Sequence, residues 1–89
     1  MSTLLPLPER LTHAEASAFL ALGRAQVVAG MPLLLDARAL QVFDSSAVAV
    51  LLALRRSVQA AGGALQVQGT PPRLRALLVL YGVGELLPA

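Results

Sequence analysis

The sequence predicts an α/β fold in which helices pack against a small, mostly parallel sheet. Three short apolar segments, typical of strands, alternate with three longer segments whose apolar residues recur at helical spacing. Strands that alternate with helices are joined by right-handed crossovers, which leave the strands parallel. The 89 residues contain no repeat, linker or low-complexity segment, so we expect one domain over residues 1–89.

The first expected strand is Thr3–Leu7, a short apolar segment that Pro6 interrupts. Because proline cannot donate a hydrogen bond to a neighbouring strand, this segment is predicted to be an edge strand or an extended arm. Thr12 and Glu15 have the spacing of a capping box, in which each side chain accepts a hydrogen bond from the backbone of the other residue. A helix is therefore expected to begin near Thr12.

The first helix is predicted over Ala16–Ala29, and Gly30 and Pro32 are expected to end it. Its apolar residues are Phe19, Leu20, Leu22, Val27 and Val28. The next segment, Leu33–Asp36, is apolar without alternation, which is typical of a parallel strand covered on both faces.

The central helix is predicted over Ser45–Ala61, because Gly62-Gly63 is a strong stop signal. Its buried face is expected to contain Ala47, Val50, Leu51, Leu54 and Val58. The connection Ala37–Asp44 precedes this helix. The apolar residues of the connection, which are expected to fold inward, are Leu40, Val42 and Phe43.

The last third of the chain predicts one more strand and one more helix. Leu65–Gln68 alternates apolar and polar residues, as a strand covered on one face does. Pro72 is acceptable in the first turn of the third helix, and Gly82 is expected to end it. The core residues of this helix are predicted to be Leu74, Leu77, Leu78 and Tyr81. Leu86-Leu87 is expected to pack back onto the sheet.

Polar residues gather where the second strand ends and the central helix begins. Asp36, Asp44, Ser45 and Ser46 all fall at the carboxyl edge of the predicted sheet, where open α/β sheets bind their ligands. Asp and Ser are favoured N-caps, but a helix has only one N-cap, so one hydroxyl is surplus. A phosphate group on this hydroxyl would be stabilised by the positive end of the helix dipole, whereas the negative charge of Asp44 would repel it. These residues leave open whether the hydroxyl is a cap, a phosphate acceptor or a docking contact.

The composition argues against several classes of function. All seven basic residues are arginine, the net charge is +2 and aromatic residues make up 3%, unlike the basic, aromatic surfaces that bind nucleic acid. With no cysteine and one histidine, neither a metal nor a cofactor is expected. The chain has no nucleophile elbow and no Gly-rich phosphate loop, so we do not expect an enzyme. No apolar run approaches the about 20 residues of a membrane span, and no signal peptide is recognisable.

The hydrophobic fraction of 56% instead favours a module that binds another protein. A domain of this size leaves part of its apolar surface exposed, and a contiguous apolar patch normally marks a partner.

Residues 30–89 combine an apolar strand, the motif Phe43-Asp44-Ser45-Ser46-Ala47 at the start of an apolar helix, Gly62-Gly63, a second strand and the helix Pro72–Tyr81. In this order they resemble a STAS domain, the family named for sulfate transporters and anti-sigma-factor antagonists. The family motif usually has glycine where this chain has Ala47. One strand of the N-terminal hairpin is missing, so a smaller sheet than the family's is expected.

The resemblance implies a non-catalytic, protein-binding role in one of two branches. The STAS subunit of Mla-type phospholipid transporters, which maintain outer membrane lipid asymmetry, binds the cytoplasmic ATPase of the ABC complex and supports its assembly and activity. That branch carries a hydroxyl at the position of Ser45. In anti-sigma-factor antagonists the second hydroxyl, here Ser46, is phosphorylated by a kinase that is itself the anti-sigma factor.

We favour the transporter branch, because the short chain and its ending over residues 80–88 are similar to that subunit. The expected partner is then the ABC ATPase, and the anti-sigma-factor kinase is the alternative. The domain would be cytoplasmic and held at the inner face of the inner membrane through its partner. The residues expected to bind the partner are Leu40, Val42, Asp44, Ser45 and Ser46. In the alternative branch, Ser46 and then Ser45 are the expected phosphorylation sites.

Overall fold

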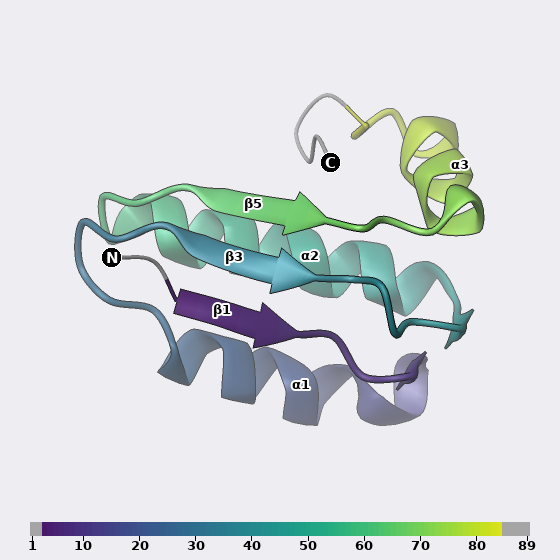
Figure 1. Ribbon diagram of the computed structural model, residues 1–89, viewed down its shortest axis with the longest axis horizontal. Helices are drawn as coiled ribbons and strands as arrows, with labels where there is room; N and C mark the ends of the chain where they lie inside the picture. Colours follow the sequence, from purple (N-terminus) through teal and green to yellow (C-terminus); the bar gives the residue numbers. More distant parts are fainter. Residues whose placement is uncertain (1–2, 85–89) are drawn as a thin grey trace.

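The structure, a computed structural model, describes residues 3–84 and shows a parallel sheet with two helices along it and a third at its end (Figure 1). The strands of the sheet are β1 (Thr3–Pro6), β3 (Leu33–Asp36) and β5 (Leu65–Gln68). The helices are α1 (His13–Ala25), α2 (Ser45–Ala60) and α3 (Pro72–Leu80). The predicted α/β fold and its alternation of strands and helices are confirmed.

The three strands run parallel in the order β1-β3-β5, so β1 is an edge strand as predicted. Leu35 of β3 lies opposite Leu5 of β1 and Val67 of β5. Both crossovers move across the sheet in the same direction. Because such crossovers are right-handed, α1 and α2 lie on the same face of the sheet.

The prediction that β3 is covered on both faces is wrong. Leu33 and Leu35 are buried, but Leu34 between them is only half-buried. Its neighbour in register, Leu4 of β1, is 55% exposed. A strand is covered on both faces only where helices lie on both faces of the sheet. Here the two crossover helices, α1 and α2, lie on the same face.

Helix α1 begins directly after Thr12, as the capping box predicts, but it ends earlier than predicted. It runs over His13–Ala25, and the predicted capping box between Thr12 and Glu15 is present. Its 13 residues span about 20 Å. A four-residue strand such as β3 spans about 13 Å, so the helix is longer than the strand that it packs along. The chain therefore turns back toward β3 before the predicted end, and Val28 lies beyond the helix and is exposed. Leu22 lies within α1 but is exposed as well.

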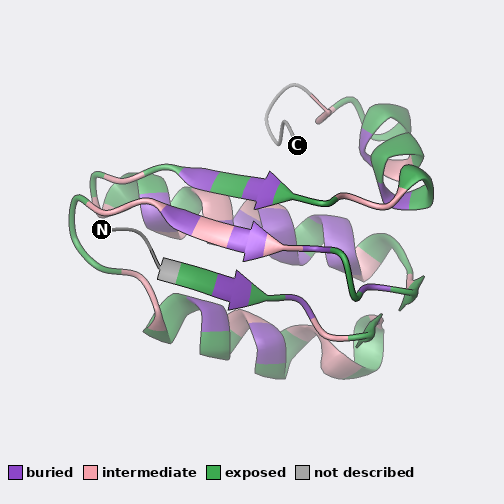
Figure 2. Cartoon of the chain, in the orientation of Figure 1, coloured by how far each residue is buried: buried purple, intermediate pink, exposed green. Residues whose placement is uncertain are grey.

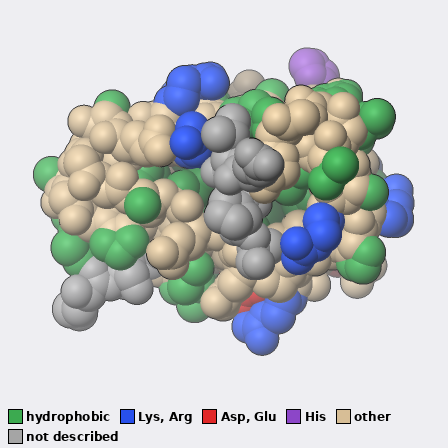
Figure 3. Space-filling model, turned by 90° about the horizontal axis from the view of Figure 1, so that it is seen from above, with side chains coloured by type: hydrophobic (Ala, Val, Ile, Leu, Met, Phe, Trp, Pro, Cys, Tyr) green, Lys and Arg blue, Asp and Glu red, His purple; other side chains and the backbone are tan. Residues whose placement is uncertain are grey.

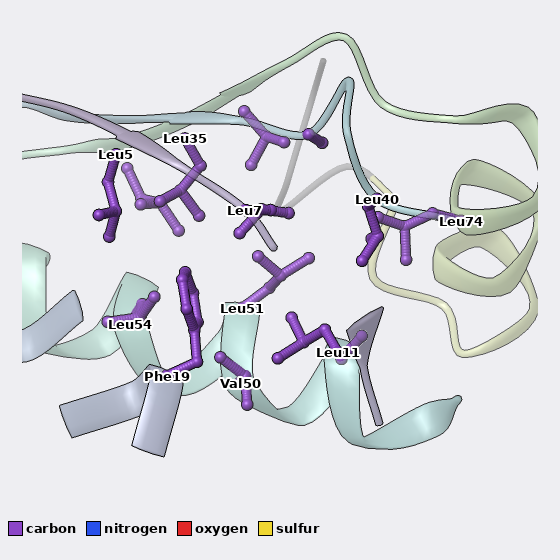
Figure 4. Packing of buried hydrophobic residues seen from close by; sticks show 14 of the residues in the cluster. Leu5, Leu7, Leu11, Phe19, Leu35, Leu40, Val50, Leu51, Leu54 and Leu74 are labelled. Atoms are coloured by element: carbon purple, nitrogen blue, oxygen red, sulfur yellow. The ribbon is translucent and has the colours of Figure 1, made fainter. Parts of the chain in front are cut away.

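Helix α2 confirms the predicted central helix. It begins at Ser45 and ends at Ala60, just before Gly62, whose φ of +86° favours glycine. All five residues predicted for its buried face are buried, and Val48 and Ala53 are buried with them. In the core, side chains of the sheet such as Leu5 and Leu35 point toward Phe19 of α1 and Leu54 of α2 (Figure 4).

Gly23 allows α1 and α2 to approach closely. It is buried, and a Cβ added there would lie 2.6 Å from Cδ2 of Leu54. One residue further along, Nε of Arg24 donates a hydrogen bond to Oγ of Ser57 at 3.3 Å. The C-terminal halves of the two helices are therefore in direct contact.

A second, two-stranded parallel sheet was not predicted. It pairs β2 (Arg10–Leu11), which directly precedes α1, with β4 (Val42–Phe43), which directly precedes α2. The carbonyl oxygen of Glu9 accepts hydrogen bonds from the N–H groups of Gln41 and Val42 at 2.9 and 3.0 Å. This pairing brings the beginnings of the two helices together.

Helix α3 contributes Leu74 and Leu78 to the core, while its outer side is exposed (Figure 2). Leu77 is half-buried, but the prediction that Tyr81 is a core residue is wrong, because Tyr81 is 50% exposed. It follows the last helical residue and lies beyond the part of α3 that packs. Leu86-Leu87 lies outside the described residues. Among the residues described, no helix has the length and apolar character to cross a bilayer.

Candidate functional site

Three helices begin at the carboxyl edge of the sheet, as each follows a strand (Figure 1). Their N-caps are Thr12 for α1, Asp44 for α2 and Pro71 for α3. The first N–H groups of a helix have no partner within it, and the helix dipole is positive there. This edge of the molecule therefore concentrates backbone hydrogen-bond donors, and the carboxylates of Glu15 and Asp44 accept hydrogen bonds from some of them.

Asp44 joins the beginnings of α1 and α2. Its Oδ1 accepts a hydrogen bond from the N–H of Ser46 at 2.8 Å, and its Oδ2 accepts one from the N–H of His13 at 3.2 Å. The N–H of Ser46 is the main reason that the pKa of Asp44 is lowered, and the N–H of His13 adds to the effect. The carboxylate is therefore both the N-cap of α2 and a link to α1.

Because Asp44 is the cap, neither serine hydroxyl is needed for that purpose. Ser45 is exposed on the first turn of α2, and Ser46 is half-buried beside α1. The sequence left open which of the three polar residues caps the helix, and the structure assigns that role to Asp44. Neither hydroxyl caps the helix, although the side chain of Ser46 also helps to lower the pKa of Asp44.

The two apolar site residues predicted from the sequence occupy different environments. Leu40 is only 3% exposed and belongs to the core, so it supports the loop from inside. The prediction that Val42 folds inward is wrong, because Val42 of β4 is 40% exposed at the surface next to Asp44. Arg73, at the start of α3, lies over the ring of Phe43 with its Cζ 5.3 Å from the ring centroid, which attaches α3 to the same edge.

Asp36 has a structural partner at the end of β3. Its carboxylate accepts hydrogen bonds from Nε of Arg38 at 2.9 Å and from Nη2 at 2.6 Å. The side chain of Arg38 is the main cause of the lowered pKa of Asp36. Gly69 at the end of β5 leaves room for this pair, since a side chain there would collide with Cγ of Arg38.

A groove of about 360 Å³ runs between α1 and α2 from this edge. The residues that line it include His13, Ser17, Leu20, Ser46, Ala49 and Arg56. Sequence reasoning did not predict it. One wall of the groove could have been inferred from the sequence, because the spacing of Ser46, Ala49, Ala53 and Arg56 places them on one face of α2. That α1 forms the other wall is a tertiary feature that this spacing does not indicate.

Asp44 receives the backbone N–H of His13, not its imidazole. Within residues 3–84, no group of three or more His, Cys, Asp and Glu side chains is placed to hold a metal ion. Asp44 and Ser45 are exposed at this surface, and the carboxylate of Asp44 bonds to the first turns of both helices.

Comparison with protein families found a match over residues 2–88 to the family described as "Mlab, STAS domain". The chain belongs to the STAS domain family. The family resemblance inferred from the sequence is thereby confirmed, and it extends into the first third of the chain.

Among solved structures, this STAS domain is similar to an anti-sigma-factor antagonist (STAS) domain protein from Planctomyces limnophilus. The match has a TM-score of 0.78 and 22% sequence identity, and it covers 97% of this chain and 79% of that one. At this identity the likeness establishes the fold. A search of curated proteins found no match. STAS domains are generally non-catalytic and mediate protein–protein interaction.

Proposed function

We propose that this STAS domain is a non-catalytic adaptor that binds the cytoplasmic ATPase of an Mla-type ABC phospholipid transporter and supports its assembly and activity. The observation that carries the proposal is the match of nearly the whole chain to the family described as "Mlab, STAS domain". The domain would then be cytoplasmic and held at the inner face of the inner membrane by the ATPase.

The proposed contact surface is the start of α2 with the residues beside it. Ser45 and Val42 are exposed there, and Ser46 lies at their side. Asp44 holds this surface rigid because its two oxygen atoms bond to the first turns of two helices. A preformed surface loses little conformational entropy on binding, which favours affinity.

Capture of the ATPase by the tagged domain tests this proposal. Ser45→Arg places a long charged side chain on the proposed surface and should weaken capture. Gln59→Arg is the matched control, because Gln59 is also exposed on α2 but lies near its other end. Circular dichroism should show that both variants stay folded. Equal capture by the two variants and the unaltered domain would overturn the proposed surface, and failure of the unaltered domain to bind the ATPase would overturn the function.

A second candidate is an anti-sigma-factor antagonist regulated by phosphorylation. The observation that favours it is the pair of hydroxyls that Asp44 leaves free of capping at a positive helix end. Ser46 would be the site of modification, and the partner would be an anti-sigma-factor kinase. Incubation with such a kinase and ATP, followed by mass spectrometry, should locate phosphate on Ser46 and lose it in Ser46→Ala but not in Ser45→Ala. Co-purification of a kinase instead of an ATPase would decide for this candidate.

A further inference from the structure

The groove between α1 and α2 is open at one end and closed at the other. It begins at His13 and Ser46, where the helices start, and it ends near Arg56. Beyond that point the hydrogen bond between Arg24 and Ser57 joins the helices. Ser46 and Arg56 are ten positions apart on α2, a distance of about 15 Å along the helix, or roughly three turns of a second helix lying alongside.

Small and apolar side chains form the walls and floor of the groove. Val50 and Ala53 are buried in the floor, and Leu20 is half-buried beside them. Ser17 of α1 and Ala49 of α2 are exposed along the two walls. Such short side chains let a third helix approach closely enough to bury its own apolar face.

The charge of the groove is positive. None of its lining residues is acidic, and Arg56 stands exposed at the closed end. Within residues 3–84, the one ion pair is Arg38 with Asp36, so no carboxylate of this part neutralises Arg56. The negative charge of Asp44 offsets positive charge only at the open end of the groove, where its carboxylate bonds to the first turns of the two helices. On the face that Figure 3 shows, arginine side chains project at several places, whereas little acidic surface is visible among the coloured residues.

We propose that this groove binds an amphipathic helix of the partner protein, with small apolar residues on the groove floor and an Asp or Glu side chain paired with Arg56. The groove is complementary to such a helix in its apolar floor and its charge. The identification of the partner as the ATPase rests on the proposed function. The short length and the exposed walls make the groove a poor fit for a lipid acyl chain, which needs an enclosed apolar site.

Photo-crosslinking tests which segment occupies the groove. A benzophenone amino acid is placed at Ala49 of the full-length domain, which is then expressed together with the ATPase. Ala18 is the control position, since it is exposed on α1 but does not line the groove. Crosslinking at position 49 alone, to an ATPase peptide of helical pattern that contains Asp or Glu, is the expected result. Equal crosslinking at both positions would overturn the proposal.

Charge reversal then tests the pairing with Arg56. Arg56→Glu should weaken binding of the ATPase roughly tenfold, because it replaces attraction by repulsion, and Arg56→Lys should change it little. Arg55→Glu is the matched control, since Arg55 is adjacent but does not line the groove. Changing the crosslinked Asp or Glu of the ATPase to Arg should restore binding to the Arg56→Glu domain. Equal effects of the two reversals, or no restoration, would contradict the proposed pairing.

The outcomes separate this inference from the proposed function. If Ser45→Arg weakens binding of the ATPase and Arg56→Glu does not, the adaptor function stands and the groove proposal fails. If the unaltered domain does not bind the ATPase, the adaptor function fails, and the same variants are measured against the anti-sigma-factor kinase. Binding of phosphatidylglycerol vesicles that Arg56→Glu abolishes would show a lipid site and overturn the inference.

Discussion

Replacement of Gly23 by alanine tests the close contact between α1 and α2. The added methyl group would lie 2.6 Å from Cδ2 and 2.9 Å from Cδ1 of Leu54, which is fully buried. Overpacking of this kind costs about 1–3 kcal/mol. Alanine favours the helix over glycine by about 1 kcal/mol, which offsets part of this cost. We therefore expect Gly23→Ala to lower the free energy of unfolding by about 1 kcal/mol.

The sign of the effect should reverse when Leu54 is shortened. In a Leu54→Val background both Cδ atoms are absent, so Gly23→Ala should raise the free energy of unfolding by about 1 kcal/mol through helix propensity. Urea unfolding of the unaltered domain, the two single variants and the double variant measures this coupling. For a domain of this size, 1 kcal/mol corresponds to about 4–8 °C in Tm. A Gly23→Ala domain that is more stable than the unaltered one would refute the reasoning.

Three further predictions concern the edge of the sheet. Thr12→Ala removes the capping box of α1 and should cost about 1 kcal/mol in the free energy of unfolding, measured by urea titration. The pKa of Asp44 is lowered from 3.8 in the folded state, so its contribution to stability is present above that value and is lost as the pH falls through the lower folded pKa. Asp44→Asn, which does not titrate, should therefore lose less stability than the unaltered domain between neutral pH and pH 2, in thermal melts followed by circular dichroism. Gly69→Ala forces a side chain into a backbone with a φ of +68° and against Arg38, and should cost about 1–2 kcal/mol or more in urea unfolding.

Each of these predictions has a contrary outcome. An unchanged urea midpoint in Thr12→Ala would mean that the capping box does not stabilise α1. Equal acid losses of stability in Asp44→Asn and the unaltered domain would assign the acid transition to Glu15 and Asp36, whose pKa values are also lowered. A stable Gly69→Ala domain would contradict the left-handed backbone at Gly69.

Much of the secondary structure was predictable because its signals are local. The apolar residues of α2 recur at helical spacing up to Gly62, and the alternation of Leu65–Gln68 matches its buried and exposed residues. Thr12 and Glu15 are three residues apart and form the capping box that their spacing predicts. In each case the residues that decide the structure lie within one or two turns of each other.

The ends and exposed faces of these elements were less predictable. Val28 continues the apolar pattern of α1 but is exposed, because the helix stops once it has passed along the sheet. Leu34 has the composition of a fully covered strand but is half-buried, because both crossovers place their helices on one face. Local composition carries no information on which face of a sheet receives a helix.

For the candidate site, the sequence by itself determined its place and chemical character. The motif of Asp44, Ser45 and Ser46 begins an apolar helix at the carboxyl edge of a parallel sheet, and it contains a hydroxyl that is not needed as the helix N-cap. Only the tertiary structure decided that Asp44 is the cap, that it also bonds to His13 across 31 positions of sequence, and that a positively charged groove opens beside it. These features join segments that are distant in the chain. Their relative placement is set by the pairing of β2 with β4 and the handedness of the crossovers, and no local pattern of residues encodes it.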